Sequence, residues 1–318
     1  MPGVSAELGV GQEEHAVGAA PTREPQTSQA SFPRGIWGSL LGTDFSITHR
    51  QIGNWNTRVL ETGTGDELLI LLPGTGGHLE AYSRNLAKLG SQFRVVAYDW
   101  PGHGFTSLAQ ADLELPAYLE HLDGVIDSFG AESVHLCGES LGGWVAAKYA
   151  AAHPERVRRI VLNTPGGTMS APDVMARIRD LSQAAADDPS EERIRARLEW
   201  LMADPASVTD ELVEVRQAIY SQPGFAQSMR HILCLQDPTI RQRNLITDDE
   251  LAAIRAETLV VWTSDDPSGP AAAGLQMAER IPAARFALIE GAGHWPQWEQ
   301  SAVFNELIAN FLREGLSR

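Results

Sequence analysis

The sequence contains very little cysteine. Cys137 and Cys234 are the two cysteines among 318 residues, which is too few for a disulfide framework, and no cysteine–histidine cluster has the spacing of a zinc site. Cys137 lies in an apolar run and is expected to be a buried strand residue. This usage fits a reducing compartment, so we expect a cytoplasmic protein that needs neither a metal nor another cofactor for its stability.

Long apolar runs are also missing. A membrane-spanning helix needs a run of about 18 or more apolar residues, and the sequence has none. Residues 1–31 are rich in Gly, Pro, Ser, Gln and Glu and contain no apolar segment. We therefore expect them to form a disordered leader and not a secretory signal.

Positive charge is scarce. The chain has 25 Lys and Arg against 41 Asp and Glu, a formal net charge of −16. Nucleic acids and anionic membranes are bound by clustered basic residues, so neither is an expected partner. A small molecule is the expected ligand, and an acidic one would need local positive groups to hold it.

The sequence does contain a regular alternation of strand-like and helix-like segments. Apolar runs such as Leu68–Leu72 have strand length and suit a strand buried on both faces. Ser133–Cys137 and Thr258–Trp262 continue the pattern, each followed by a helical segment. Strands that alternate with helices predict βαβ units, and hence an α/β fold with a mostly parallel sheet.

The alternation stops between residues 167 and 246. This stretch is rich in Arg, Glu, Ala and Leu at helical spacing and has no strand-like run. We predict that it forms a helical cap inserted between two parts of an α/β core, residues 32–166 and 247–318. Ligands of open α/β sheets bind at the carboxyl ends of the strands, where such a cap would cover them.

A strand, a tight turn and a helix surround Ser140. Gly138–Gly142 matches the pattern G-x-S-x-G, with the predicted strand Ser133–Cys137 before it and a predicted helix from Gly142 to Ala152 after it. Such a turn lifts the serine hydroxyl clear of the sheet, and the small glycines let the chain pass beneath it. The context predicts that Ser140 is a nucleophile.

A serine nucleophile needs a base and a group that orients the base. His294 lies in a loop between the last predicted strand and the last helix, at the same sheet edge as Ser140. The loop after Thr258–Trp262 offers Asp265 and Asp266, of which we favour Asp266. The chain order of serine, aspartate and histidine is that of α/β-hydrolases.

Two backbone N–H groups are expected to stabilise the oxyanion that a serine attack creates. One belongs to Leu141, directly after the nucleophile. The other belongs to the loop after Leu68–Leu72, where we favour Thr75. This loop begins with Pro73 in place of the usual histidine. The histidine side chain is not required, because the donor is a backbone N–H further along the loop.

Four stretches together resemble one family. They are Pro73–His78, Asp99–Gly104, Gly138–Gly143 and Gly293–Glu299. From about Ile36 onward the chain is similar to the meta-cleavage product hydrolases, the C–C bond hydrolases of bacterial aromatic degradation. The resemblance implies an α/β-hydrolase fold with a sheet of about eight strands and a helical cap. It also implies hydrolysis of a 2-hydroxy-6-oxo-dienoate without a cofactor or metal, and a homodimer.

The resemblance also implies substrate contacts. Arg216, in a segment similar to the family's cap helix, would hold the substrate carboxylate, although a solvated helix arginine is the simpler interpretation of that residue. Trp295 would pack against the substrate, and Gly76 would contact it from the oxyanion loop. Glu139 stands where family members often have an asparagine that helps hold the substrate.

Departures such as Glu139 leave other functions open. A carboxylesterase or lactonase could use the same Ser140, His294 and Asp266 on a small ester. A binding protein that keeps the fold without turnover is a third hypothesis, and the complete set of catalytic residues argues against it.

Overall fold

The central sheet of the computed structural model has eight strands in the order β1-β2-β4-β3-β5-β6-β7-β8. The structure describes residues 35–36, 38–168 and 171–315, so the leader predicted over residues 1–31 lies outside the described residues. The strands are β1 (Phe45–Ile52), β2 (Trp55–Thr62), β3 (Leu68–Leu72), β4 (Arg94–Tyr98), β5 (Val134–Glu139), β6 (Val157–Asn163), β7 (Glu257–Thr263) and β8 (Ala284–Ile289).

The sheet is parallel from β4 to β8. The first hairpin, β1–β2, is antiparallel and adds to the edge of β4, whereas β3, β4, β5, β6, β7 and β8 pair in parallel. The central β3 is buried along its whole length, as its apolar run predicted. The α/β fold with a mostly parallel sheet is therefore confirmed.

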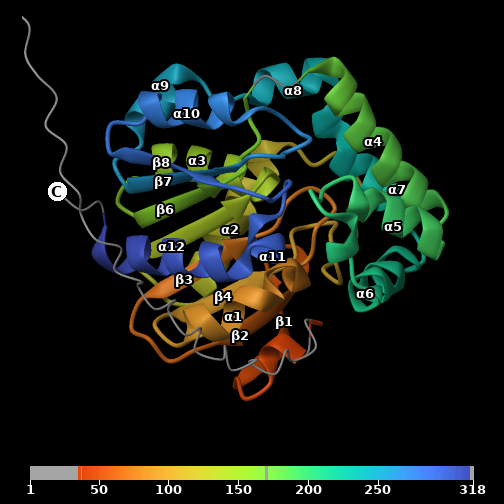
Figure 1. Ribbon diagram of the computed structural model, residues 1–318, viewed down its shortest axis with the longest axis horizontal. Coiled ribbons are helices and arrows are strands. Elements are labelled where there is room, and N and C mark those ends of the chain that lie inside the picture. Colours follow the sequence, from red (N-terminus) through yellow and green to blue (C-terminus); the bar gives the residue numbers. More distant parts are fainter. Residues whose placement is uncertain (1–34, 37, 169–170, 316–318) are drawn as a thin grey trace, which may run out of the picture. The chain divides into compact units, whose positions relative to one another are not determined.

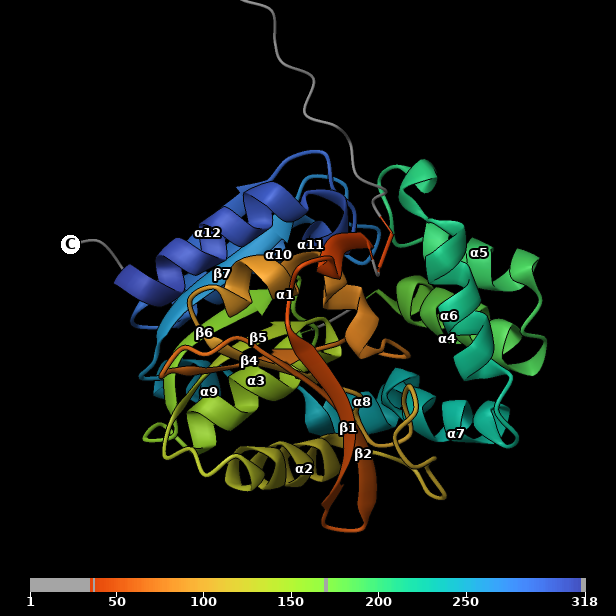
Figure 2. The same cartoon turned by 90° about the horizontal axis from the view of Figure 1, so that it is seen from below.

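Helices cover both faces of this sheet (Figure 2). One face packs against α2, α3 and α10, and the other packs against α1 and α12. The helices outside the inserted segment are α1 (Ser83–Gly90), α2 (Leu115–Ser128), α3 (Leu141–Ala152), α9 (Asp248–Ala253), α10 (Ala271–Arg280), α11 (Pro296–Glu299) and α12 (Ser301–Glu314). None of the helices in the described residues has the length and apolar character that a membrane crossing requires.

The segment between β6 and α9 is helical. Its α-helices lie together beside one end of the strands, drawn in green and teal in Figure 1. They are α4 (Pro172–Asp187), α5 (Glu191–Glu199), α6 (Asp210–Tyr220), α7 (Phe225–Ile232) and α8 (Pro238–Asn244). We call α4–α8 the inserted helices, and four short 3₁₀ helices complete the described fold: η1 (Gly38–Leu40), η2 (Leu79–Tyr82), η3 (Pro205–Ser207) and η4 (Leu233–Gln236).

Two helical segments of the core are interrupted. Residues 79–90 begin as the 3₁₀ helix η2 and become α-helical at α1, and the last helical segment is divided into α11 and α12 at Gln300. In the first case Asp99 accepts a hydrogen bond from the Leu79 N–H at 2.8 Å, so the start of the segment is held from outside the helix. Such a tertiary contact is not visible in helical periodicity.

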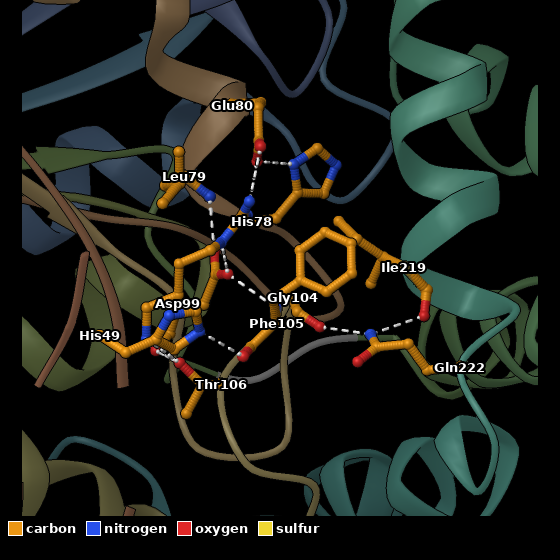
Figure 3. A network of polar contacts seen from close by, with 11 residues as sticks. His49, His78, Leu79, Glu80, Asp99, Gly104, Phe105, Thr106, Ile219 and Gln222 are labelled. Atoms are coloured by element: carbon orange, nitrogen blue, oxygen red, sulfur yellow. Dashed lines mark hydrogen bonds and ion pairs between the residues drawn. The ribbon is translucent and has the colours of Figure 1, made fainter. Parts of the chain in front are cut away.

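A buried ion-pair network ties β2 to the loops after β3 and β4. The Arg58 guanidinium donates to both carboxylate oxygens of Glu80 at 2.8 Å and to Asp99 at 2.6 Å. Glu80 also lies 2.8 Å from His78 Nδ1, and Asp99 accepts from the Phe105 N–H at 2.9 Å. Figure 3 shows the contacts of Glu80 and Asp99, with Ile219 and Gln222 to one side of them.

The same network supports a contact between the core and the inserted helices. Gln222, just after α6, donates to the Gly104 carbonyl at 2.8 Å and to the Ile219 carbonyl at 2.8 Å (Figure 3). Gly104 has a φ of 53°, and a Cβ there would meet the Asp99 carboxylate at 1.9 Å. The network thus fixes the loop around Gly104, whose carbonyl accepts the hydrogen bond from Gln222.

We expect Arg58→Met to destabilise the protein strongly. It would leave the carboxylates of Glu80 and Asp99 buried without their cation, which costs ~3–5 kcal/mol of unfolding free energy. Urea denaturation followed by circular dichroism measures this loss. Arg193→Met is the matched control, because Arg193 pairs with Asp188 at the surface, and an exposed pair contributes at most ~1 kcal/mol. Equal losses in the two variants would contradict the assignment.

Candidate active site

Ser140 lies on a strained turn between β5 and α3. Its backbone has φ 53° and ψ −112°, a left-handed conformation that residues with a side chain rarely adopt. The turn is tight because its glycines pack against backbone. A Cβ on Gly138 would lie 2.3 Å from Gly142, and a Cβ on Gly142 would lie 2.1 Å from the Leu72 carbonyl oxygen. The predicted nucleophile therefore sits on the sharp elbow that its motif requires.

His294 and Asp266 meet at the carboxyl end of the sheet. The Nδ1 atom of His294 lies 3.0 Å from each carboxylate oxygen of Asp266. The neighbouring Asp265 accepts instead from the Ser264 hydroxyl at 2.6 Å. The geometry thus supports the choice of Asp266 over Asp265 as the group that orients the imidazole.

Ser268 is a contact that the sequence did not reveal. Its backbone N–H donates to Asp266 Oδ1 at 2.8 Å, and its hydroxyl lies 3.2 Å from His294 Nδ1. It therefore holds the Asp266 carboxylate in the orientation that His294 uses. The only signal in the sequence is a serine two residues after the favoured Asp266.

The loop that carries His294 is held by the segment that follows α5. The His294 N–H donates to the Leu201 carbonyl at 2.6 Å. A Cβ on Gly293 would lie 2.3 Å from the same carbonyl oxygen, so glycine permits this close approach. From the core, the Thr164 hydroxyl donates to the His294 carbonyl at 3.1 Å. The position of the imidazole thus depends on both the core and the inserted helices.

A cavity of about 490 Å³ opens above these residues. The core contributes most of the predicted site residues, and the inserted helices contribute the opposite wall. Core residues that line it are Thr75, Glu139, Ser140, Leu141, Asp266, Ser268, His294 and Trp295, and facing residues are Val174, Ile178, Arg197, Trp200 and Arg241. This volume suits a small organic molecule.

The loop after β3 contains a backbone N–H, that of Thr75, which no described residue accepts. The Gly74 N–H donates to Glu139 Oε2 at 2.7 Å, and the Gly77 N–H donates to the Gly74 carbonyl at 2.9 Å. Neither of these two groups is therefore available to a substrate. Thr75 lies between them and lines the cavity together with Leu141, which fits the prediction for both residues.

Gly76 is turned toward the inserted helices. It has a φ of 68°, and its carbonyl accepts a hydrogen bond from the Tyr220 hydroxyl at 3.1 Å. Among the described residues that line the cavity, its neighbours Thr75 and Gly77 are present and Gly76 is not. This geometry gives Gly76 a role in shaping the loop.

Glu139 occupies an unexpected position. It is 2 % exposed, and its Oε1 lies 3.3 Å from His294 Nε2, the ring nitrogen opposite the one that faces Asp266. Within the described part of the chain, no hydrogen bond joins Nε2 to the Ser140 hydroxyl. The group that pairs with the predicted base in this structure is thus a second carboxylate.

Two carboxylates determine the protonation of His294. Burial lowers the pKa of the imidazole, but the charge and hydrogen bond of Asp266, together with those of Glu139, outweigh burial and raise this pKa to about 10. The ring is therefore positively charged at neutral pH in this arrangement.

Three arginines of the inserted helices are buried near the site. Arg216 is 1 % exposed, and its guanidinium lies 5.5 Å from the centre of the Trp295 ring. Its Nε and Nη2 atoms have no hydrogen-bond partner among the described residues. Arg216 is not among the described residues that line the cavity, whereas Trp295, Arg197 and Arg241 are. The simpler interpretation of Arg216 as a solvated residue does not hold, since the side chain is buried.

Burial and the charge of a neighbouring arginine act on Arg197. Burial, and then the nearby charge of Arg216, lower the pKa of Arg197 to about 10. A buried guanidinium without a carboxylate partner is costly, and an anionic ligand would offset that cost.

The described residues contain no group of three or more His, Cys, Asp or Glu side chains that could hold a metal ion.

Comparison with known proteins gives a consistent result. Residues 69–307 match the family described as "Alpha/beta hydrolase family". The chain is 30% identical over 279 residues to a 2-hydroxy-6-oxo-6-phenylhexa-2,4-dienoate hydrolase of Burkholderia cepacia, covering 85% of this chain and 96% of that protein. It is 31% identical to a 2-hydroxy-6-oxononadienedioate/2-hydroxy-6-oxononatrienedioate hydrolase of Burkholderia vietnamiensis, covering 80% and 89%.

Solved structures agree with this. A meta-cleavage product hydrolase from Pseudomonas fluorescens superimposes with a TM-score of 0.70 at 28% identity, covering 82% of this chain and 94% of that one. The fold, the elbow and the contact of His294 with Asp266 agree with an α/β-hydrolase. The chain therefore belongs to the α/β-hydrolase family and is a hydrolase similar to the meta-cleavage product hydrolases.

Proposed function

We propose that the chain hydrolyses a C–C bond in a 2-hydroxy-6-oxo-dienoate, with Ser140 as nucleophile, His294 as base and Asp266 as the group that orients the base. The observation that carries this proposal is the 3.0 Å contact between His294 Nδ1 and Asp266 at the cavity that Ser140 lines. Relatives of about 30% identity that carry the names of such hydrolases support it.

The reaction would proceed in two halves. The dienol first becomes its keto tautomer, so that the carbon that will leave can carry negative charge. Ser140 Oγ then passes its proton to His294 and forms a bond to the remote carbonyl carbon. The C–C bond breaks, the leaving carbon takes the proton from His294, and an acyl-enzyme remains. His294 then removes a proton from water, and the resulting attack releases the acid and restores Ser140.

The N–H groups of Leu141 and Thr75 would hold the oxyanion of each tetrahedral intermediate. Removal of one such preorganised donor typically raises the barrier by ~2.7–4 kcal/mol. The Leu141 N–H lies at the first turn of α3, where the helix dipole also favours negative charge. No cofactor or metal takes part in these steps.

Arg216 would anchor the substrate carboxylate. Its buried guanidinium has unpartnered N–H groups and lies against Trp295, which lines the cavity and would pack on the diene. A planar guanidinium binds a carboxylate through two charge-assisted hydrogen bonds. Arg197 and Arg241 add positive charge to the wall of a cavity in an otherwise acidic chain.

The inserted helices would serve as a cap that closes this cavity, and the proposed setting is the cytoplasm. Cys137 and Cys234 are both free and buried, which is compatible with a reducing environment. We also propose a small-molecule substrate as the only ligand and a homodimer as the assembly, which light scattering of the purified protein would test.

A small ester is the alternative substrate class. The observation that favours it is Glu139, which places a negative charge where the family often has an asparagine that holds the substrate. The same Ser140, His294 and Asp266 would then carry out ordinary ester or lactone hydrolysis. Nitrophenyl esters and dienoates, offered side by side, separate the two functions.

We expect the purified protein to bleach the yellow absorbance of a ring-fission dienoate. Ser140→Ala should lower kcat by ~10³-fold or more, because the nucleophile is lost while binding remains. Ser46→Ala is the control, since Ser46 is an exposed serine on β1, and it should stay near wild type. Good turnover of nitrophenyl esters without bleaching of any dienoate would instead support the alternative.

Arg216→Gln should weaken use of an anionic substrate selectively. Loss of the charge-assisted pair should lower kcat/KM for a dienoate by ~10–100-fold, mostly through KM. A neutral nitrophenyl ester should show little change. Arg230→Gln removes a surface arginine that pairs with Asp187 and should affect neither substrate. Equal losses on both substrates in Arg216→Gln would point to damage of the inserted helices.

The pH dependence of kcat/KM should rise toward alkaline pH. His294 must be neutral to accept the Ser140 proton, and its pKa is raised to about 10. Below that pKa the neutral fraction increases ~10-fold per pH unit. A stopped-flow series from neutral to alkaline pH measures the rise. A profile that is flat from pH about 7 upward would show that His294 is already neutral there.

A further inference from the structure

Glu139 is held between the oxyanion loop and the predicted base. Its Oε2 accepts the Gly74 N–H at 2.7 Å, and its Oε1 lies 3.3 Å from His294 Nε2. The residue ends β5 and pairs there with Asn163 of β6. A single side chain next to the nucleophile thus contacts both other parts of the catalytic machinery.

The fit around this carboxylate is close. A Cβ on Gly74 would lie 2.5 Å from Glu139 Oε2, so only glycine leaves room for the contact. The Glu139 side chain is almost fully buried and lines the cavity. The position of the carboxylate is therefore set by the packing of the loop as well as by charge.

The chemistry of the contact determines where protons lie. An ionised carboxylate oxygen offers only lone pairs, so its 3.3 Å contact with Nε2 is favourable when that nitrogen carries a proton. Nδ1 faces the Asp266 carboxylate in the same way. With both nitrogens protonated, His294 is an imidazolium and has no lone pair with which to accept the proton of Ser140.

Other charged groups around His294 do not alter the preference for the imidazolium form. Asp266 follows β7 and Glu139 ends β5, and these two are the charges that raise the imidazole pKa. From the inserted helices, Arg197 and Arg241 line the same cavity. Behind the loop, Glu299 of α11 accepts the Gly293 N–H at 2.7 Å.

We propose that Glu139 is a positioning residue that holds the resting His294 as an imidazolium through Nε2 and thereby sets the pH at which Ser140 can be activated. To become a base, His294 gives its Nε2 proton to water. The neutral nitrogen then exchanges Glu139 for the Ser140 hydroxyl and accepts its proton. This inference rests on the proposed roles of Ser140 and His294, and it does not depend on which substrate is cleaved.

Glu139→Gln is the sharpest test, since it changes the charge and keeps the shape. The amide oxygen can still accept the Gly74 N–H. The amide NH₂ then faces His294 Nε2 and donates to it, which favours the neutral imidazole. The variant should therefore make the base available at lower pH.

The readout is the rate at which a fluorophosphonate labels Ser140, followed by intact-protein mass spectrometry across a pH series. We expect the midpoint of the rise to move down by about one pH unit or more in Glu139→Gln, so that labelling at neutral pH becomes ~10-fold faster. Asp265→Asn is the control. It removes one charge from the Asp266 loop, but Asp265 is exposed and pairs with Ser264, so its midpoint should match the wild type.

Two results would overturn the proposal. One is a midpoint in Glu139→Gln that moves no more than in Asp265→Asn. The other is labelling lost at every pH in a folded variant, which would make the Glu139 carboxylate itself necessary. Fast labelling of the wild type without bleaching of any dienoate would sink the proposed substrate while leaving this inference intact.

A measurement on the unmodified protein guards against a variant that does not fold. Nitrogen-15 chemical shifts of the His294 ring report whether each ring nitrogen carries a proton. At neutral pH we expect both to be protonated in the wild type. A neutral ring at that pH would overturn the proposal without any substitution. For the labelling series, Glu139→Asn is a second variant with a neutral side chain.

Discussion

The ring of His294 lies between two buried carboxylates, and the rest of the site depends on that arrangement. Asp266 holds Nδ1 at 3.0 Å, and Glu139 lies 3.3 Å from Nε2. The strained elbow creates the second contact, because a turn that lifts Ser140 out of the sheet also directs the preceding side chain into the cavity. The nucleophile and the group that competes with it for the base are therefore consecutive residues on one constrained segment.

The inserted helices complete the site. The carbonyl of Leu201 fixes the backbone of His294 at 2.6 Å, so a movement of that segment would also move the base. The same part of the chain brings buried arginines toward a cavity whose floor carries two carboxylates. This distribution would let an acidic protein bind the proposed anionic substrate, because buried charges near the cavity are poorly screened by solvent.

Much of the fold and the core of the site could be predicted from the sequence, because the signals are local. The apolar run of β3 and the G-x-S-x-G turn at Ser140 each depend on neighbouring residues. The order of Asp266 and His294 follows from loops at one sheet edge. By contrast, the contacts of Ser268 and Leu201 with His294 join segments that only the folded chain brings together. Glu139 was noticed as a departure from the family, yet its partner on the far loop could not be inferred from spacing.

A carboxylate beside the oxyanion hole would at first sight oppose catalysis, since it repels the developing negative charge. The proton that leaves Ser140 resolves this conflict. When His294 takes that proton it becomes an imidazolium that is paired with Asp266 and still close to the charge of Glu139, and both carboxylates stabilise it. The contact between Glu139 and His294 thus lowers the fraction of neutral imidazole in the resting enzyme, but it stabilises the imidazolium in the transition state. At alkaline pH, where the supply no longer limits the rate, Glu139 would aid the reaction.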